Sequence, residues 1–184
     1  MVQSMTLPHV IAVACDDQHN IIKPVRESIH LIAGLGVEGD AHAGKTIQHR
    51  YDKRRNPDAP NLRQVHLIQS ELFDEVAALG MTVKPGQMGE NITTRGLDVL
   101  RLSRGTHLKM GKAIIEVTGL RNPCKYLNQI APGLMKACIG QWEDGTILPK
   151  TGIMGIVING GDVRAGDEIH IIAPDAPYER LKPV

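Results

Sequence analysis

The sequence contains few aromatic side chains, with one Trp, one Phe and three Tyr in 184 residues. Proteins that bind single-stranded nucleic acid stack its bases on aromatic rings, so this scarcity argues against a nucleic-acid partner. The net charge of +1 also provides no overall attraction to nucleic acid or to an anionic membrane surface. The composition instead predicts an aliphatic core.

Cysteine is scarce as well. Cys15, Cys124 and Cys138 make an odd count, and none of them stands in a C-x-x-C spacing. This pattern argues against a disulfide scaffold, a zinc ribbon and an iron–sulfur site. We therefore expect a reducing compartment, and we interpret Cys15 and Cys138 as core residues.

Long apolar segments are missing too, since no run approaches the roughly 20 residues that span a bilayer. The apolar run at residues 9–15 is too short for a secretory signal and has no basic region before it. These features predict a soluble cytoplasmic protein without membrane contact. The length predicts one compact domain over residues 1–184.

Short apolar segments separated by turn residues dominate what is present, and 19 Gly and 11 Pro supply the turns. Segments 102–110 and 163–171 share one pattern, in which an apolar residue is followed after three positions by glycine and then by alternating apolar residues. We predict a mainly β, barrel-like fold, closed or nearly closed, with a few short helices. The candidate strands are residues 9–14, 28–33, 65–69, 113–120 and 152–160, and the candidate helices are residues 70–79 and one or two within 123–139.

The stretch GLGVEGDAHAGKT at residues 34–46 matches both the G-x-G-x-x-G and the G-x-x-x-x-G-K-[ST] phosphate-loop patterns. Both patterns require an apolar-faced helix directly afterwards. The next residues are strongly polar, and Pro57 and Pro60 interrupt them. A dinucleotide-binding fold and a nucleoside triphosphatase are therefore not expected.

The chemistry of this loop still favours an anion. Glycine-freed backbone amides beside Lys45, His42 and the basic run at 50–55 could hold a phosphate-bearing ligand. The alternative is a solvated, mobile loop, and for residues 53–55 alone this alternative is favoured.

The segment RNPCKYLN at residues 121–128 contains the best candidate for chemistry. Asn122 is a favoured helix N-cap and Pro123 suits the first helical position, so Cys124 is expected in the first turn. Unpaired amides, the helix dipole and the flanking Arg121 and Lys125 then predict a lowered thiol pKa, and hence a nucleophile or a soft-metal ligand. A small buried residue beside a helix start is the alternative.

These motifs, in this order, resemble the MOSC domain, a family named after the C-terminal part of molybdenum cofactor sulfurases. The resemblance covers about residues 28–172. It rests on GVEGDAHAGK (36–45), the Arg63 strand, GQMGENITT (86–94), RNPCKYLN (121–128) and GIMGIVINGGDVRAGDEI (152–169). The resemblance implies a β-barrel-like fold that binds the pterin-based molybdenum cofactor, molybdopterin, with Cys124 as the protein ligand to molybdenum.

Motif position also suggests which residues hold the rest of the cofactor, whose phosphate and pterin need hydrogen-bonding groups. Asp40, His42 and Glu90 are in addition candidates for a proton donor, and the sequence does not choose among them. The residues assigned to cofactor binding are Asp40, His42, Lys45, Arg63, Asn91, Thr93 and Arg121.

Characterised relatives of this kind reduce N-hydroxylated compounds, so the resemblance implies a molybdenum oxidoreductase acting on a small-molecule substrate. No flavin or iron–sulfur module is recognisable, so electrons must come from a separate reductase. Two alternatives stay open. Cys124 could carry a persulfide, received from a cysteine desulfurase, for metallosulfur centre assembly. A non-enzymatic β-barrel could also bind an anionic partner through residues 42–63, with Cys124 merely structural.

Overall fold

The fold consists mainly of β-strands, as the sequence predicts. The computed structural model describes residues 7–184, with the side chains of residues 50 and 51 outside the description. The helices are α1 (Arg50–Arg55), α2 (Glu71–Ala78) and α3 (Leu134–Ala137), with 3₁₀ turns η1 (Val99–Arg101) and η2 (Lys125–Gln129). The strands are β1 (His9–Ala14), β2 (Val25–Arg26), β3 (Ser28–Ile32), β4 (Gly36–Val37), β5 (Val65–Gln69), β6 (Ile92–Arg95), β7 (His107–Met110), β8 (Ala113–Leu120), β9 (Ile139–Gln141), β10 (Ile147–Pro149), β11 (Ile153–Asn159), β12 (Gly161–Arg164) and β13 (His170–Ile172).

Most strands belong to one eight-stranded sheet in the order β13-β7-β8-β11-β5-β6-β1-β2, accompanied by a three-stranded sheet β12-β3-β4 and the hairpin β9-β10. Every pair in the large sheet is antiparallel except β5 and β6. Parallel neighbours need a crossover connection, and α2 lies in that connection. The two segments with the shared pattern meet in the large sheet, because β13 pairs with β7.

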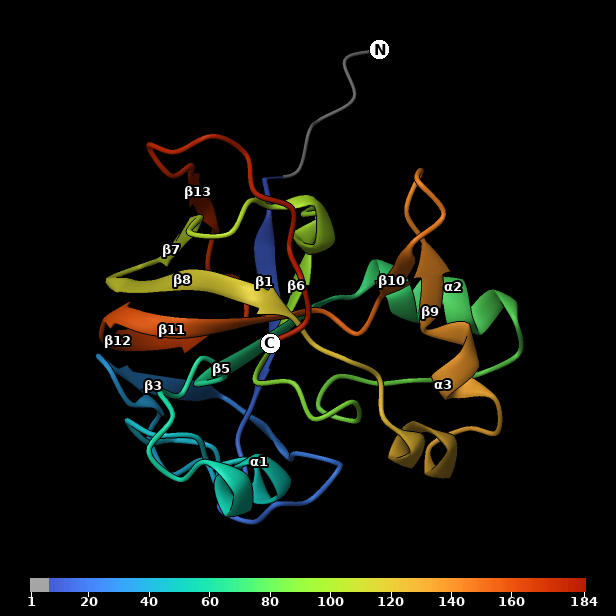
Figure 1. The fold of residues 1–184 in the computed structure, drawn as a ribbon, viewed down its shortest axis with the longest axis horizontal. Coiled ribbons are helices and arrows are strands. Elements are labelled where there is room, and N and C mark those ends of the chain that lie inside the picture. The colour runs from blue at the N-terminus through green and yellow to red at the C-terminus, as the bar shows by residue number, and fades with distance from the viewer. Residues whose placement is uncertain (1–6) are drawn as a thin grey trace.

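The expected barrel is not closed, since the large sheet ends at β13 on one side and at β2 on the other. The chain leaves the large sheet after β11 and enters the small one as β12, which pairs with β3. Gly160 permits this step, because a Cβ there would lie 2.6 Å from the carbonyl oxygen of Leu31. The result is a barrel-like arrangement of two sheets, seen on the left of Figure 1.

Two hydrophobic clusters stabilise the fold. The larger lies within the sheets and includes Leu31, Leu67 and Ile115, none of which is exposed. The smaller lies among α2, η2 and α3 and includes Leu72 and Leu127. Figure 1 shows α2, α3 and the β9-β10 hairpin together on the right, beside the sheets.

Helix α2 follows the predicted pattern with one exception. Leu72, Phe73 and Val76 are buried on one face, as their spacing predicts. Leu79 has the spacing of the same face and ends the predicted helix 70–79, but it follows the last helical residue and its exposed fraction is 67%. Within residues 7–184, no helix is long and apolar enough to cross a bilayer.

Candidate functional site

A cavity of about 850 Å³ brings together five of the residues predicted from the sequence. They come from four segments, namely the glycine-containing loop after β4, the segment before β5, the loop before β6 and the segment after β8. Helix α1 and the η2 turn lie at the same end of the molecule, at the bottom of Figure 1. The five residues are His42, Arg63, Asn91, Arg121 and Cys124.

Cys124 lies at the end of an extended segment, which differs from the prediction. Strand β8 ends at Leu120, and Cys124 is the N-cap of η2, with φ −120° and ψ 159°. It therefore precedes the first helical turn instead of lying in it, and the helix is a 3₁₀ turn of 5 residues. The prediction was wrong because Cys124 itself keeps an extended backbone, so the helical turn begins one residue later, at Lys125. The thiol is free and half-buried in the cavity wall.

Arg121 places a guanidinium beside that thiol. Burial lowers the pKa of Arg121, while a hydrogen bond with Cys124 and the nearby Glu90 oppose the change. Its Nη1 atom is buried and has no hydrogen-bond partner within the described part of the chain. A buried donor without an acceptor is costly, so this atom points to an anionic or polar ligand.

Asp40 lies beneath the cavity and does not line it. Its enclosed carboxylate accepts from Lys23 Nζ at 2.6 Å and from Asn91 Nδ2 at 2.9 Å through Oδ2. Its Oδ1 accepts from the backbone N and ring Nδ1 of His42 at 2.9 Å and 3.1 Å. Burial raises the pKa of Asp40, but His42 and the Lys23 ammonium outweigh burial and hold it well below its usual range. Asp40 therefore orients three groups that do line the cavity.

Glu90 and Thr93 form a second enclosed cluster and are not among the cavity-lining residues. The Glu90 carboxylate accepts from the backbone N of Gly86 and Met88 and from Thr93 Oγ1. Burial raises the pKa of Glu90 against the effect of these hydrogen bonds. The structure places both residues so that they shape the loop before β6, and the cofactor-binding role predicted for Thr93 stays a prediction.

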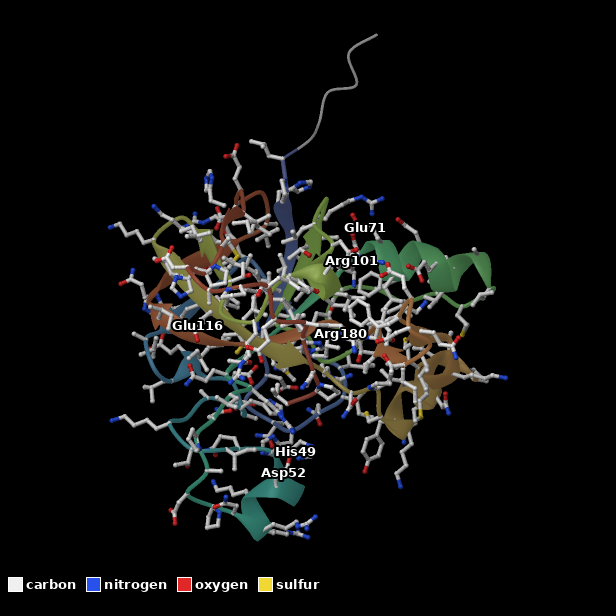
Figure 2. The ribbon with its side chains drawn as sticks, turned by 45° about the horizontal axis from the view of Figure 1, so that its top comes forward. His49, Asp52, Glu71, Arg101, Glu116 and Arg180 are labelled. Atoms are coloured by element: carbon white, nitrogen blue, oxygen red, sulfur yellow. The ribbon has the colours of Figure 1, made fainter. Side chains whose placement is uncertain are left out.

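The opposite side of the cavity is more exposed. Asp52 of α1 accepts from Arg63 Nη1 at 3.1 Å and lies 3.0 Å from His49 Nδ1. Figure 2 shows His49 and Asp52 side by side at α1. Burial lowers the pKa of His49, with Asp52 opposing the change. The guanidinium of Arg63 is thus already paired with a carboxylate of the chain itself.

Lys45 is exposed and does not line the cavity. Its loop leads to a β-bridge between Thr46 and Pro60, so no helix follows the loop directly, and α1 begins only at Arg50. This confirms that neither phosphate-loop pattern has its usual structural context. The role of Lys45 in anion binding stays a prediction.

The cavity residues that sequence reasoning missed include Lys23 and His66. The ring Nε2 of His66 lies 2.7 Å from the carbonyl oxygen of Thr151, so Nε2 carries the hydrogen. Burial and the charge of Arg121 lower the pKa of His66 well below its usual range. The only signal for His66 was a polar residue within an otherwise apolar strand, and Lys23 stands in no motif.

The comparisons with known proteins agree with this architecture. The MOSC domain family matches residues 38–170, which confirms the resemblance found in the sequence. Protein YiiM of Escherichia coli (strain K12) is 35% identical over 98 residues, covering 53% of this chain and 41% of YiiM. The matched stretch thus spans less than half of that relative.

Solved structures show the same fold. YUAD protein from Bacillus subtilis has a TM-score of 0.73 at 21% identity, covering 92% of this chain and 98% of that chain. YiiM from Escherichia coli has a TM-score of 0.61 at 21% identity, covering 93% of this chain and 73% of that chain. YiiM from Geobacillus stearothermophilus has a TM-score of 0.63 at 18% identity, covering 90% of this chain and 75% of that chain. At these identities the likeness establishes the fold.

Proposed function

Because the chain belongs to the MOSC domain family, we propose that it binds the molybdenum cofactor in the cavity beside Cys124 and reduces N-hydroxylated small molecules. The observation that carries the proposal is the buried Nη1 of Arg121, which has no hydrogen-bond partner among the described residues and lies next to a half-buried thiol. An anionic ligand that also bears a soft metal satisfies both groups at once.

The cavity suits such a ligand in size and charge. Its volume of about 850 Å³ lies in the range of roughly 300–1,000 Å³ that is usual for cofactor sites. Lys23, Arg63 and Arg121 line it, with Asp52 as the one acidic lining residue among those described. The molybdenum cofactor carries a phosphate and a dithiolene, so a cationic lining favours it.

Each residue then has a specific part. The Cys124 sulfur holds the metal, Arg121 and Arg63 bind anionic groups, and Asn91 presents polar atoms from a fixed position. Asp40 acts from below by orienting Asn91 and His42. When bound, the cofactor supplies a centre that exchanges two electrons with the substrate.

The electron donor is a separate reductase in this proposal. Among residues 7–184, no group of three His, Cys, Asp or Glu side chains is arranged to hold a metal ion. A reducing compartment such as the cytoplasm would keep Cys15, Cys124 and Cys138 as free thiols.

The test is elemental analysis with pterin fluorescence on protein purified from a host that makes the cofactor. Wild type and the matched control Cys15→Ser, another half-buried free cysteine, should hold molybdenum near one per chain. Cys124→Ser should hold little, because a hydroxyl is a poor ligand for a soft metal centre. Equal molybdenum in Cys124→Ser and wild type would show that Cys124 is not the ligand.

A second candidate function is sulfur transfer, which the half-buried free thiol and its contact with Arg121 also favour. In this case Cys124 accepts sulfur from a cysteine desulfurase as a persulfide. Mass spectrometry would then find cyanide-labile sulfur on Cys124 and no stoichiometric pterin.

If no sulfur is transferred and no molybdenum is bound, the remaining candidate function is that of an anion-binding module. For that module, charge reversal at Lys45 and Arg63 should abolish binding, while Cys124→Ala should not.

A further inference from the structure

The hydrogen bond between Asp40 and His42 distinguishes the two ring nitrogens of His42. The Asp40 carboxylate is ionised and accepts from His42 Nδ1 at 3.1 Å. A carboxylate only accepts, so Nδ1 carries a hydrogen in both the neutral and the charged ring. Nε2 is therefore the ring nitrogen of His42 that Asp40 leaves available to a ligand in the cavity.

The ring is held in place on several sides. The backbone carbonyl of His42 accepts from Asn61 Nδ2 at 2.9 Å, and its backbone N donates to Asp40. The ring of His19 packs edge-on against it, with the two centroids 4.9 Å apart. The His42 side chain is 32% exposed and lines the cavity. Nε2 thus belongs to a fixed, partly solvated ring.

The other candidates for a proton donor lack this combination. Asp40 and Glu90 are enclosed and do not line the cavity. His66 lines it, but burial and the charge of Arg121 lower its pKa well below the usual range, so the ring stays uncharged, and its one hydrogen, on Nε2, is already donated to the carbonyl of Thr151. His49 lines it too, but its Nδ1 partner Asp52 is shared with Arg63 in the exposed α1 segment.

The charges around His42 are also defined. Asp40, which accepts from the ring, is paired with Lys23, so together the two add no net charge. His19 lies against the ring, and His49, with Asp52 and Arg63, lines the other side of the cavity. Histidine changes its protonation state between about pH 5 and 8, where an enzyme at neutral pH can use it.

We infer that His42 is the catalytic acid of the proposed reduction. This inference rests on the proposed function. Conversion of R–NHOH to R–NH₂ and water consumes two electrons and two protons. The N–O bond breaks, the two electrons come from the electron-donating reductase, and Nε2 of His42 gives one proton to the departing oxygen. Solvent gives the other proton to nitrogen and then reprotonates His42, so the oxygen leaves as water.

The decisive variant is His42→Asn, whose amide can still donate to Asp40 from the position of Nδ1 but has no group at Nε2. Its matched control is His30→Asn. His30 Nδ1 lies 2.6 Å from Asp162 in an exposed pair between β3 and β12, outside the cavity lining. Both variants should bind molybdenum as wild type does. Turnover should fall by roughly 10²–10⁴-fold in His42→Asn alone, and the limb of the pH profile that requires a protonated acid should disappear.

Two further measurements separate proton donation from positioning. Added imidazole should restore part of the turnover of His42→Ala. In wild type without cofactor, ring ¹⁵N spectra should show Nε2 titrating while Nδ1 keeps its hydrogen.

Unchanged turnover and pH profile in His42→Asn would overturn the inference, and so would a neutral ring with its hydrogen on Nε2. Loss of molybdenum in His42→Asn would overturn it by assigning the residue to cofactor binding. Absence of molybdenum from the wild type would instead contradict the proposed function itself, and the ¹⁵N spectra distinguish the two failures.

Discussion

The cavity has two walls that use similar groups in different surroundings. The inner wall consists of Lys23, His42 and Asn91, which are held together by the enclosed Asp40, and the outer wall consists of His49, Asp52 and Arg63. Both contain a carboxylate, a cation and a histidine. The Lys23 and Asp40 side chains are 2% and 0% exposed, whereas those of Arg63 and Asp52 are 27% and 32% exposed. The two walls therefore differ in how deeply their charged groups are buried and not in the types of residue they contain.

This difference assigns the walls different parts. In the inner wall every charged atom has fixed partners, and removing one partner leaves a buried charge uncompensated. In the outer wall the ion pair is exposed to solvent and contributes little to stability. The inner wall therefore fixes the shape of the cavity, while the outer wall can exchange its partner for an anionic ligand.

Lys23→Met should produce the largest effect. Met fills a similar volume, but the Asp40 carboxylate loses its cation, so the free energy of unfolding should fall by about 3–5 kcal/mol. Urea denaturation followed by circular dichroism measures this loss. Lys112→Met, in the exposed turn after β7, is the control and should unfold as wild type does. Equal urea midpoints for Lys23→Met and Lys112→Met would show that the buried ion pair of the inner wall does not stabilise the fold.

The contribution of Asp40 to the inner wall should also appear in the pH dependence of the free energy of unfolding. The folded-state pKa of Asp40 lies below its unfolded value, so its contribution is complete above about pH 4 and is lost as pH falls through the folded value. The difference in unfolding free energy between wild type and Asp40→Asn should therefore be constant near neutral pH and shrink in acid. Asp175→Asn, at an exposed position, serves as the control. A difference that grows below about pH 4 would reverse the assigned sign.

Asp52→Asn should produce the smallest effect. It should change the affinity for an anionic ligand and leave the stability of the fold unchanged. Removing this carboxylate frees the Arg63 guanidinium, so inorganic phosphate should bind up to about fivefold more tightly, which matches the modest strength of an exposed pair. Isothermal titration calorimetry on protein without cofactor measures the change. Asp58→Asn removes the same charge from an exposed position of the same segment. Equal affinities for these two variants would show that Asp52 does not compete for Arg63.

Much of the architecture could be predicted because its signals are local. The alternating apolar residues of Ile29 and Leu31, or of Leu108 and Met110, predict which face of a strand is buried, and these side chains are buried. The shared pattern around Gly105 and Gly166 predicted turns entering strands, and both glycines adopt positive φ. The order of the motifs was sufficient to indicate the family.

The candidate site could be predicted only in part. Cys124, Arg121 and His42 were found because each stands in a motif. Thr93 was assigned to the cofactor by its motif; it is not among the cavity-lining residues and its hydroxyl donates to Glu90, so its role stays a prediction. A motif identifies a polar group, but backbone register and packing decide which way that group faces.

The sequence by itself determined the mainly β architecture, the helix α2 and the presence of a cysteine beside a cation. These features depend on periodicity, turns and neighbours within a few positions. The tertiary structure alone decided that Lys23, Asp40 and Asn91 meet, although they lie on three separate segments. It also aligned His42 on a buried carboxylate and left Arg121 Nη1 without a hydrogen-bond partner in the part of the chain that is described. Buried charges are tolerated only with partners, and the packing of the sheets and loops determines which partners lie within reach.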